Sequence, residues 1–119
     1  MARVTEVALL IPQGSTYIHE FTYVEEDEVT PIDITGFTAR CQIRRTIKNT
    51  TIELECTTEN SKIVITDETN GVFELRIPST DTEAFSFTRA VYDIEMIAPD
   101  LSVSRVVQGK VKVDPEVTR

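Results

Sequence analysis

The sequence predicts an all-β sandwich built as one domain. Almost every segment alternates apolar and polar residues, which is the period of a strand with one buried face. Short turns rich in Gly, Pro, Asn and Asp separate these segments at regular intervals. The length of 119 residues is typical of one domain, and such a chain buries about two thirds of its unfolded surface. We therefore expect a single β-sandwich domain over residues 1–119.

The first two strands are expected on either side of a turn. VTEVALLI, residues 4–11, reads as a strand, and Pro12-Gln13-Gly14 reads as the turn that follows it. STYIHEFTYV, residues 15–24, is predicted as the second strand. The segment EEDEVTPID after it is acidic and is expected to be a solvated loop.

Two alternating segments, residues 37–44 and 52–56, are predicted to form a hairpin. Pairing Cys41 with Cys56 places the apolar residues of both strands on one side. The same register sets Arg44 opposite Glu53, a favourable pair across strands. We expect two buried, reduced thiols that act as small apolar side chains. A disulfide is the alternative, which synthesis in a reducing cytoplasm disfavours.

Two further hairpins follow. The dipeptide Asn70-Gly71 predicts a tight turn between strands at 62–67 and 72–77. The last hairpin turns at residues 99–102, and its register lays the Tyr92 ring across Gly109, which also could mark a bulge.

Between these hairpins a short helical turn is expected near residues 79–86. Thr80 and Glu83 have the spacing of a capping box, in which each side chain satisfies a backbone N–H of the first turn. Together with the strands, this gives a prediction of about 7–8 antiparallel strands and one helical turn.

Composition and charge exclude several functional classes. The formal net charge is −8, which disfavours general binding to nucleic acids and to anionic membranes. No apolar run approaches the ~20 residues of a membrane span. The apolar run near the start is short and is interrupted by Thr5 and Glu6, so we do not interpret it as a signal peptide. Synthesis in a cytoplasm is the expectation.

The residues that carry catalysis or metal binding are sparse. His19 is the single histidine, and no Ser or Cys has the spacing of a catalytic triad. One histidine and two cysteines do not supply the four ligands of a structural zinc site. The acidic run at residues 25–28 lacks the glycine of a calcium-binding loop. We therefore predict no catalytic residue, metal, cofactor or small-molecule substrate, and no enzyme.

Two groups of residues are candidates for a protein interface. The basic cluster consists of Arg40, Arg44, Arg45 and Lys48. On an acidic protein such a strip could dock an acidic partner or another copy; the alternative is an ordinary exposed strand paired with Glu53 and Glu55. The second group is apolar and lies off the predicted core face, which is typical of strands buried on both sides: Val91, Ile97 and Val106.

The last six residues, 114–119, are a candidate docking tail. Pro115 has no N–H to donate, so the last strand is expected to end near Val113. Glu116 and Arg119 offer charges and Val117 an apolar anchor. The expectation is that this tail docks on another subunit, because few contacts inside a small domain would offset its ordering entropy.

Four stretches together resemble a known family: IPQGSTY, PIDITGFTARCQIR, VYDIEMI and SRVVQGKVKVDPEVTR. They are similar to small proteins of tailed bacteriophages of about this length, which share an early PQG turn, a DLTG turn before an IR strand, a YDLE strand and a final PEVTR. They also resemble the immunoglobulin-like amino-terminal domains of phage baseplate and tail-fibre-attachment proteins. The resemblance implies an immunoglobulin-like sandwich and a structural part of the virion.

The function that these observations predict is a non-enzymatic adaptor in a phage particle, made in the host bacterial cytoplasm. The resemblance favours the tail or baseplate, with other virion proteins, and possible further copies of the chain, as partners. One alternative is a capsid decoration or head–tail neck protein. An alternative of another class is a carbohydrate-binding or host-recognition module, which the absence of Trp and the placement of all three Tyr in strand patterns disfavour.

Overall fold

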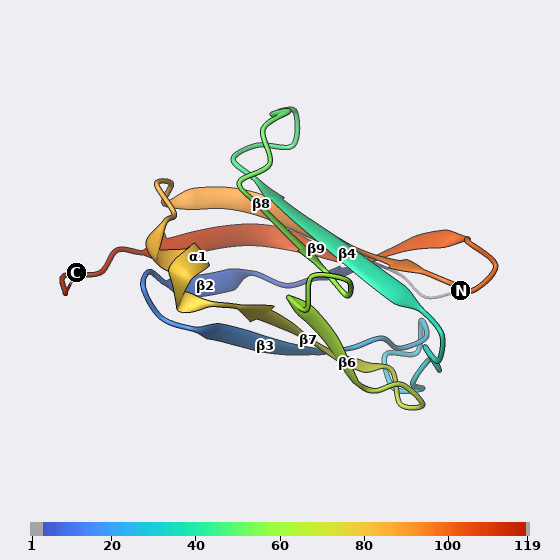
Figure 1. The fold of residues 1–119 in the computed structure, drawn as a ribbon. Helices are drawn as coiled ribbons and strands as arrows, with labels where there is room; N and C mark the ends of the chain where they lie inside the picture. The colour runs from blue at the N-terminus through green and yellow to red at the C-terminus, as the bar shows by residue number, and fades with distance from the viewer. Residues whose placement is uncertain (1–3, 119) are drawn as a thin grey trace.

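The computed structural model describes residues 4–118, which form two β-sheets packed face to face (Figure 1). The larger sheet has the order β1-β9-β8-β4-β5, with β2 also paired to β9, and the smaller has the order β3-β7-β6. The elements are β1 (Thr5–Glu6), β2 (Leu9–Pro12), β3 (Tyr17–Thr22), β4 (Thr38–Arg44), β5 (Leu54–Thr57), β6 (Ile63–Asp67), β7 (Val72–Ile77), α1 (Ser79–Glu83), β8 (Arg89–Ile97) and β9 (Val103–Asp114).

The strand order is that of an immunoglobulin-like sandwich. Three consecutive members of the larger sheet, β9, β8 and β4, correspond to the G, F and C strands, with β5 beside them as an added C′ strand. The smaller sheet supplies the B, E and D strands. β1 and β2 pair with β9 in parallel, whereas the other pairs are antiparallel. The predicted fold class is confirmed, and β1 and β2 are the two halves of the expected first strand.

The predicted hairpin registers are confirmed. Cys41 lies opposite Cys56, Ile63 opposite Leu75, and Tyr92 opposite Gly109. In each hairpin a one-residue slip would have exchanged buried and exposed faces, which explains why alternation alone defined the pairing. Both cysteines are buried and free. A hydrogen bond with the neighbouring Cys56 thiol, together with burial, raises the pKa of the Cys41 thiol well above its ordinary value.

Two local predictions are wrong. Arg44 does not pair with Glu53, because its guanidinium donates to the Asn49 carbonyl oxygen and the Gln42 side chain. Arg45, in the loop after β4, takes that partner at 3.2 Å. The short helix exists but has no capping box: Pro78 occupies the N-cap, and no side chain makes a capping hydrogen bond there.

A bulge in β9 reverses one expected face. The register shifts between the pairs Ile94–Val107 and Glu95–Arg105, so Val106 is an extra residue on β9. Its side chain turns into the core and is 2% exposed. Val106 is therefore a core residue and not part of a partner surface.

A hydrogen bond to Tyr92 joins the interrupted first strand to the core. The Tyr92 hydroxyl donates to the Val7 carbonyl oxygen at 2.6 Å, between β1 and β2. The approach is possible only because Gly109 lacks a side chain: a Cβ there would lie 2.1 Å from that oxygen. The Tyr92–Gly109 pair thus makes room for Val7 and does more than cover a glycine.

The core lies between the sheets and is almost wholly apolar. Thr82 of α1 is the one buried polar residue among those described, and its hydroxyl donates to the Ser15 carbonyl oxygen while accepting from the Gly14 N–H. These bonds fix α1 over one end of the sandwich (Figure 1). The outer faces of both sheets are left to solvent.

Candidate protein-interaction face

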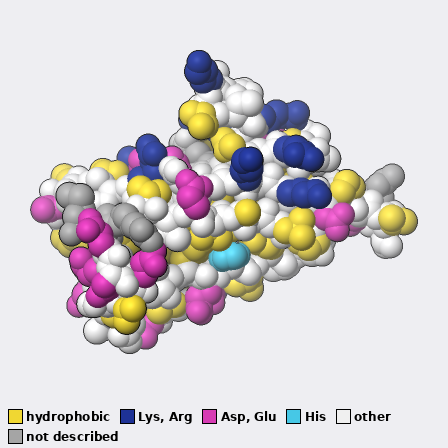
Figure 2. Space-filling view, turned by 180° about the vertical axis from the view of Figure 1, so that it is seen from behind, with side chains coloured by type: hydrophobic (Ala, Val, Ile, Leu, Met, Phe, Trp, Pro, Cys, Tyr) yellow, Lys and Arg dark blue, Asp and Glu magenta, His cyan; other side chains and the backbone are white. Residues whose placement is uncertain are grey.

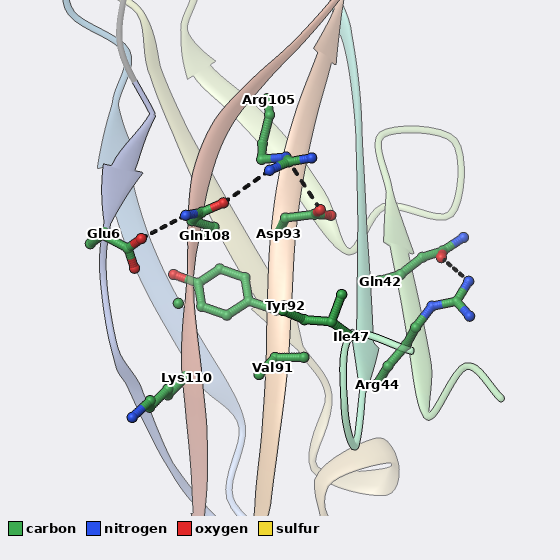
Figure 3. Close-up of a pocket in the computed structure, with 11 residues that line it drawn as sticks. Glu6, Gln42, Arg44, Ile47, Val91, Tyr92, Asp93, Arg105, Gln108 and Lys110 are labelled. Carbon is green, nitrogen blue, oxygen red and sulfur yellow. Dashed lines mark hydrogen bonds and ion pairs between the residues drawn. The ribbon is translucent and has the colours of Figure 1, made fainter. Parts of the chain in front are cut away.

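The outer face of the larger sheet is hollowed, with a volume of about 370 Å³ (Figure 3). The hollow spans β1, β9, β8 and β4, and the loop after β4 forms part of its rim. The residues that line it are Glu6, Gln42, Arg44, Ile47, Val91, Tyr92, Asp93, Arg105, Gln108, Gly109 and Lys110.

Strand register sorts the outward side chains of this face into rows. Arg44, Val91 and Lys110 form one row across β4, β8 and β9. In the adjacent row Arg89 lies directly opposite Lys112. Like charges opposite each other on neighbouring strands destabilise a sheet, so this half of the face lacks a component that would balance it.

The other half of the same face is internally balanced. The Arg40 guanidinium lies 2.7 Å from the Glu95 carboxylate, and Arg105 lies 3.6 Å from Asp93. Arg105 also donates to the Gln108 side chain, whose amide in turn donates to Glu6 at 2.6 Å. Figure 3 shows this chain of polar groups crossing the sheet as part of the lining of the hollow.

Ion pairing separates the cations of residues 4–118 into two equal groups. Five have a carboxylate partner within 4 Å: Arg40, Arg45, Lys62, Arg76 and Arg105. The other five have none, and we call them the unpaired basic cluster: Arg44, Lys48, Arg89, Lys110 and Lys112. Four lie in the two adjacent rows, and Lys48 is in the loop that rims the hollow.

Apolar side chains lie among these cations. Val91 is half-buried between Arg44 and Lys110, and Ile47 on the rim is 85% exposed. Leu10 of β2 is 58% exposed and lies beside Lys112. Apolar residues surrounded by charge are typical of the centre and rim of a protein interface.

Asp93 is the carboxylate that adjoins the unpaired basic cluster along β8. Burial and the neighbouring Glu95 raise the pKa of Asp93, and Arg105, Arg44 and Arg40 oppose that rise. Because the rise prevails, the carboxylate of Asp93 is less stable as an anion than that of an exposed aspartate.

The structure divides the interface residues predicted from sequence. Arg44 and Val91 line the hollow, and Lys48 lies in the loop that forms part of its rim. Arg40 and Arg45 are engaged by Glu95 and Glu53, and Arg45 also lies over the Phe87 ring at 5.9 Å. Ile97 is on the same outer face but at its far end, opposite Val103.

The predicted docking tail is only partly free. β9 runs one residue past the expected end, to Asp114, whose carbonyl oxygen accepts from the Gln13 N–H at 2.8 Å. The Glu116 N–H donates to the Gln13 side chain at 3.1 Å. These bonds tie Pro115 and Glu116 to the turn at residues 12–14 within the same chain, and docking of the tail on another subunit stays a prediction. Val117 is 95% exposed, and Arg119 lies outside the described residues.

Sequence reasoning missed three of the five unpaired cations: Arg89, Lys110 and Lys112. The signal was available, because the predicted register of the last hairpin already sets Arg89 opposite Lys112. Ile47 carried no signal, since its exposure follows from the course of the loop after β4.

Other candidate groups have structural roles. His19 is half-buried between Tyr17 and Phe21, its Nδ1 lies 3.2 Å from the Tyr17 hydroxyl, and burial lowers its pKa. Asp27 of the acidic run accepts the N–H groups of Val29 and Thr30 within its own loop. Across residues 4–118 no three His, Cys, Asp or Glu side chains are placed to share a metal ion. No helix of that part of the chain is long and apolar enough to cross a membrane.

Comparison with known proteins does not assign the chain to a family. No protein-family profile matches the chain, and neither does any curated protein. Among solved structures, the chain is similar to extracellular domains 3–5 of Drosophila OTK, with 13% identity and a TM-score of 0.37. The match covers 89% of this chain and 32% of that one, so the chain spans about a third of its length. Strand order, and not this likeness, defines the fold.

Proposed function

We propose that the chain is a non-enzymatic adaptor that joins larger proteins of a bacteriophage particle, in the tail or baseplate region. The docking face is the hollowed outer face of the larger sheet, and Val117 is an additional anchor. The observation that carries this proposal is the unpaired basic cluster, with Val91 among its cations and Ile47 on the rim of the hollow.

The arrangement favours a protein partner. The cluster is small and sits on a chain of net charge −8, so long-range attraction to a polyanion is weak. Val91 and Ile47, which lie among these cations, fit instead a partner surface that presents apolar residues among carboxylates. The fold itself is shared by proteins of many functions and carries no such assignment.

The virion assignment rests on the family resemblance of the PQG, DITG and PEVTR stretches. The described residues of these stretches lie in the turn after β2, in the turn before β4 and directly after β9, at residues 115–118. The first and third are joined by the bonds of Gln13 to Asp114 and Glu116. By keeping these two hydrogen bonds, the PQG and PEVTR stretches would hold Val117 in position for docking.

The experiment is to purify the particles of the phage or prophage that encodes this chain. Mass spectrometry of purified particles should find the chain, and labelled antibody should place it on the tail by electron microscopy. Label on the capsid or neck would support the decoration or neck alternative instead. Absence of the chain from intact particles would overturn the virion proposal.

A carbohydrate-binding module is disfavoured by the aromatic residues. Tyr92 is buried, and Tyr17 and Tyr23 are half-buried and packed against the core. None of the three offers an open ring on which a sugar could stack.

A further inference from the structure

We propose that the hollowed face of one copy binds the acidic loop of a second copy, so that the protein associates head to tail. The acidic loop is defined as residues 24–31, between β3 and β4. This inference identifies one partner for the face assigned under the proposed function, but it does not depend on location in a virion.

Charge is separated along the molecule. Residues 21–39 and 63–75 contain no Lys or Arg, whereas they hold eight Asp or Glu side chains: Glu25, Glu26, Asp27, Glu28, Asp33, Asp67, Glu68 and Glu74.

 In the view of Figure 2, Asp and Glu gather at one end of the molecule, and Lys and Arg gather over the half that ends in the C-terminus.

The two segments meet in space at that acidic end. The Ile34 N–H donates to the Glu68 carbonyl oxygen at 2.8 Å, and the Tyr23 N–H donates to the Gly71 carbonyl oxygen at 2.9 Å. These bonds hold the acidic loop against the turn between β6 and β7. The carboxylates of both segments therefore form one anionic surface.

The acidic loop is preorganised and presents an apolar tip. Asp27 Oδ1 accepts the N–H groups of Val29 and Thr30, each at 2.8 Å, and Val24 bridges to Pro31. Bonds from Thr30 lower the pKa of Asp27, so it stays ionised. Val29 is held 77% exposed beside these carboxylates. A rigid loop loses little conformational entropy when it docks.

The loop and the hollow are complementary. Val29 surrounded by carboxylates matches Val91 and Ile47 surrounded by cations, with Glu26 as a partner for Arg44 or Lys110. A carboxylate that approaches Arg89 and Lys112 would also relieve their repulsion. Acidic surfaces of other proteins could offer the same charges, but this chain displays both halves of the match.

The two surfaces differ, so the contact between copies is heterologous. A pair of docked copies still has one unoccupied hollow and one undocked acidic loop, so further copies can add, and such contacts make open chains, or rings where the rotation closes. The large negative net charge opposes association, so we expect it to be weak and concentration-dependent.

The test is sedimentation velocity of the purified chain over a range of concentrations. Charge pairs act over about 30 Å at 0.01 M salt but only about 3 Å at 1 M. If the charged match drives docking, the weight-average mass should rise with concentration at intermediate salt and fall towards the monomer at 1 M. A wild-type chain that stays monomeric throughout would overturn the inference.

Two variants then identify the surfaces. The hollow variant is Lys110→Glu/Lys112→Glu, and the loop variant is Glu26→Lys/Val29→Lys. Each variant on its own should associate at least about tenfold more weakly than the wild-type chain, because like charges then face each other. The matched controls are Arg40→Glu/Arg76→Glu for the first and Ile18→Lys/Glu20→Lys for the second. The controls change the same charges elsewhere and should associate as wild type does, with circular dichroism confirming that every variant is folded.

Mixing the two variants decides the geometry. The hollow variant keeps an intact loop and the loop variant an intact hollow, so an equal mixture should form a one-to-one heterodimer and nothing larger. A mixture that stays monomeric while wild type associates would overturn head-to-tail docking. Incorporation of the chain into particles is measured separately, so a failure here is distinct from a failure of the proposed function.

Discussion

The two halves of the larger sheet's outer face are built from the same strands but treat their charges differently. In the half with Arg40 and Arg105, each cation faces a carboxylate of β8. In the half with Arg89 and Lys112, cations face each other. Exposed ion pairs contribute only about 0–1 kcal/mol each, so the paired half is not what stabilises the fold. The difference separates a half whose cations are paired within the molecule from a half whose cations are not, and the second is the half that we propose binds a partner.

The largest effect is expected at Gly109, on the border between the halves. Gly109→Ala would press a methyl group against the Val7 carbonyl oxygen and break its bond from Tyr92. We expect a loss of about 3 kcal/mol in the free energy of unfolding, measured by urea denaturation.

Tyr92→Phe is the matched comparison, since it removes only the hydroxyl and should cost about 1–2 kcal/mol. Equal costs for the two variants would mean that the hydrogen bond, and not the close approach, is what requires the glycine.

The next effect concerns the carboxyl-terminal residues. Ending the chain after Val113 removes the bonds of Gln13 to Asp114 and Glu116, and should cost about 2 kcal/mol at about 1 kcal/mol per bond. Ending it after Glu116 keeps both bonds, and the melting temperature should stay within about 2 °C of the full chain. Calorimetry of the two truncated chains measures both melting temperatures. A large fall in melting temperature for the chain that ends after Glu116 would show that the last three residues stabilise the domain.

A smaller effect has opposite signs in the two halves. Lys112→Glu places a carboxylate opposite Arg89 and should stabilise the isolated domain by about 0.2–1 kcal/mol. Arg40→Glu places a carboxylate beside Glu95 and should destabilise it by a similar amount. Urea denaturation of both variants measures the pair, and destabilisation by Lys112→Glu would mean that the basic half is already balanced.

The smallest effect is on pH dependence. Burial and Glu95 raise the pKa of Asp93 in the folded state, so the folded chain binds this proton more tightly than the unfolded chain does. The resulting stability is present below the unfolded pKa of Asp93 and is lost as pH rises through its folded pKa. Asp27 behaves in the opposite way, because bonds to its carboxylate lower its pKa.

Carboxyl carbon titration by NMR should therefore find Asp93 titrating at higher pH than Asp27. Arg105→Gln should raise the pKa of Asp93 further, since Arg105 opposes the rise. A titration of Asp93 at or below that of Asp27 would contradict this assignment of causes.

Local pattern was enough to predict the hairpins. Alternation of apolar residues, with turn residues such as Gly71 between the strands, determines both the face and the register of neighbouring strands. The parallel pairing of β2 with β9 joins distant parts of the chain, and no local pattern indicates it.

The remaining differences arise where backbone geometry overrides alternation. The bulge at Val106 changes the period of alternation within one strand. The course of the loop after β4 lets Arg45, and not Arg44, form the ion pair with Glu53. The capping spacing of Thr80 and Glu83 fails because the N-cap position is occupied by Pro78 and not by Thr80. For the candidate face, register predicted the rows, but only the three-dimensional arrangement shows which cations lack carboxylates.

The parallel pairing of the first and last strands also has a mechanical consequence. The start of β1 and the end of β9 lie at opposite ends of the sandwich (Figure 1). Tension applied between those ends would load the β1–β9 and β2–β9 hydrogen bonds together, in shear, instead of opening them one by one. Forced unfolding is governed by the unfolding rate, and this geometry requires several bonds to break at once. A sandwich connected in this way can transmit a pulling force along its length while it remains folded.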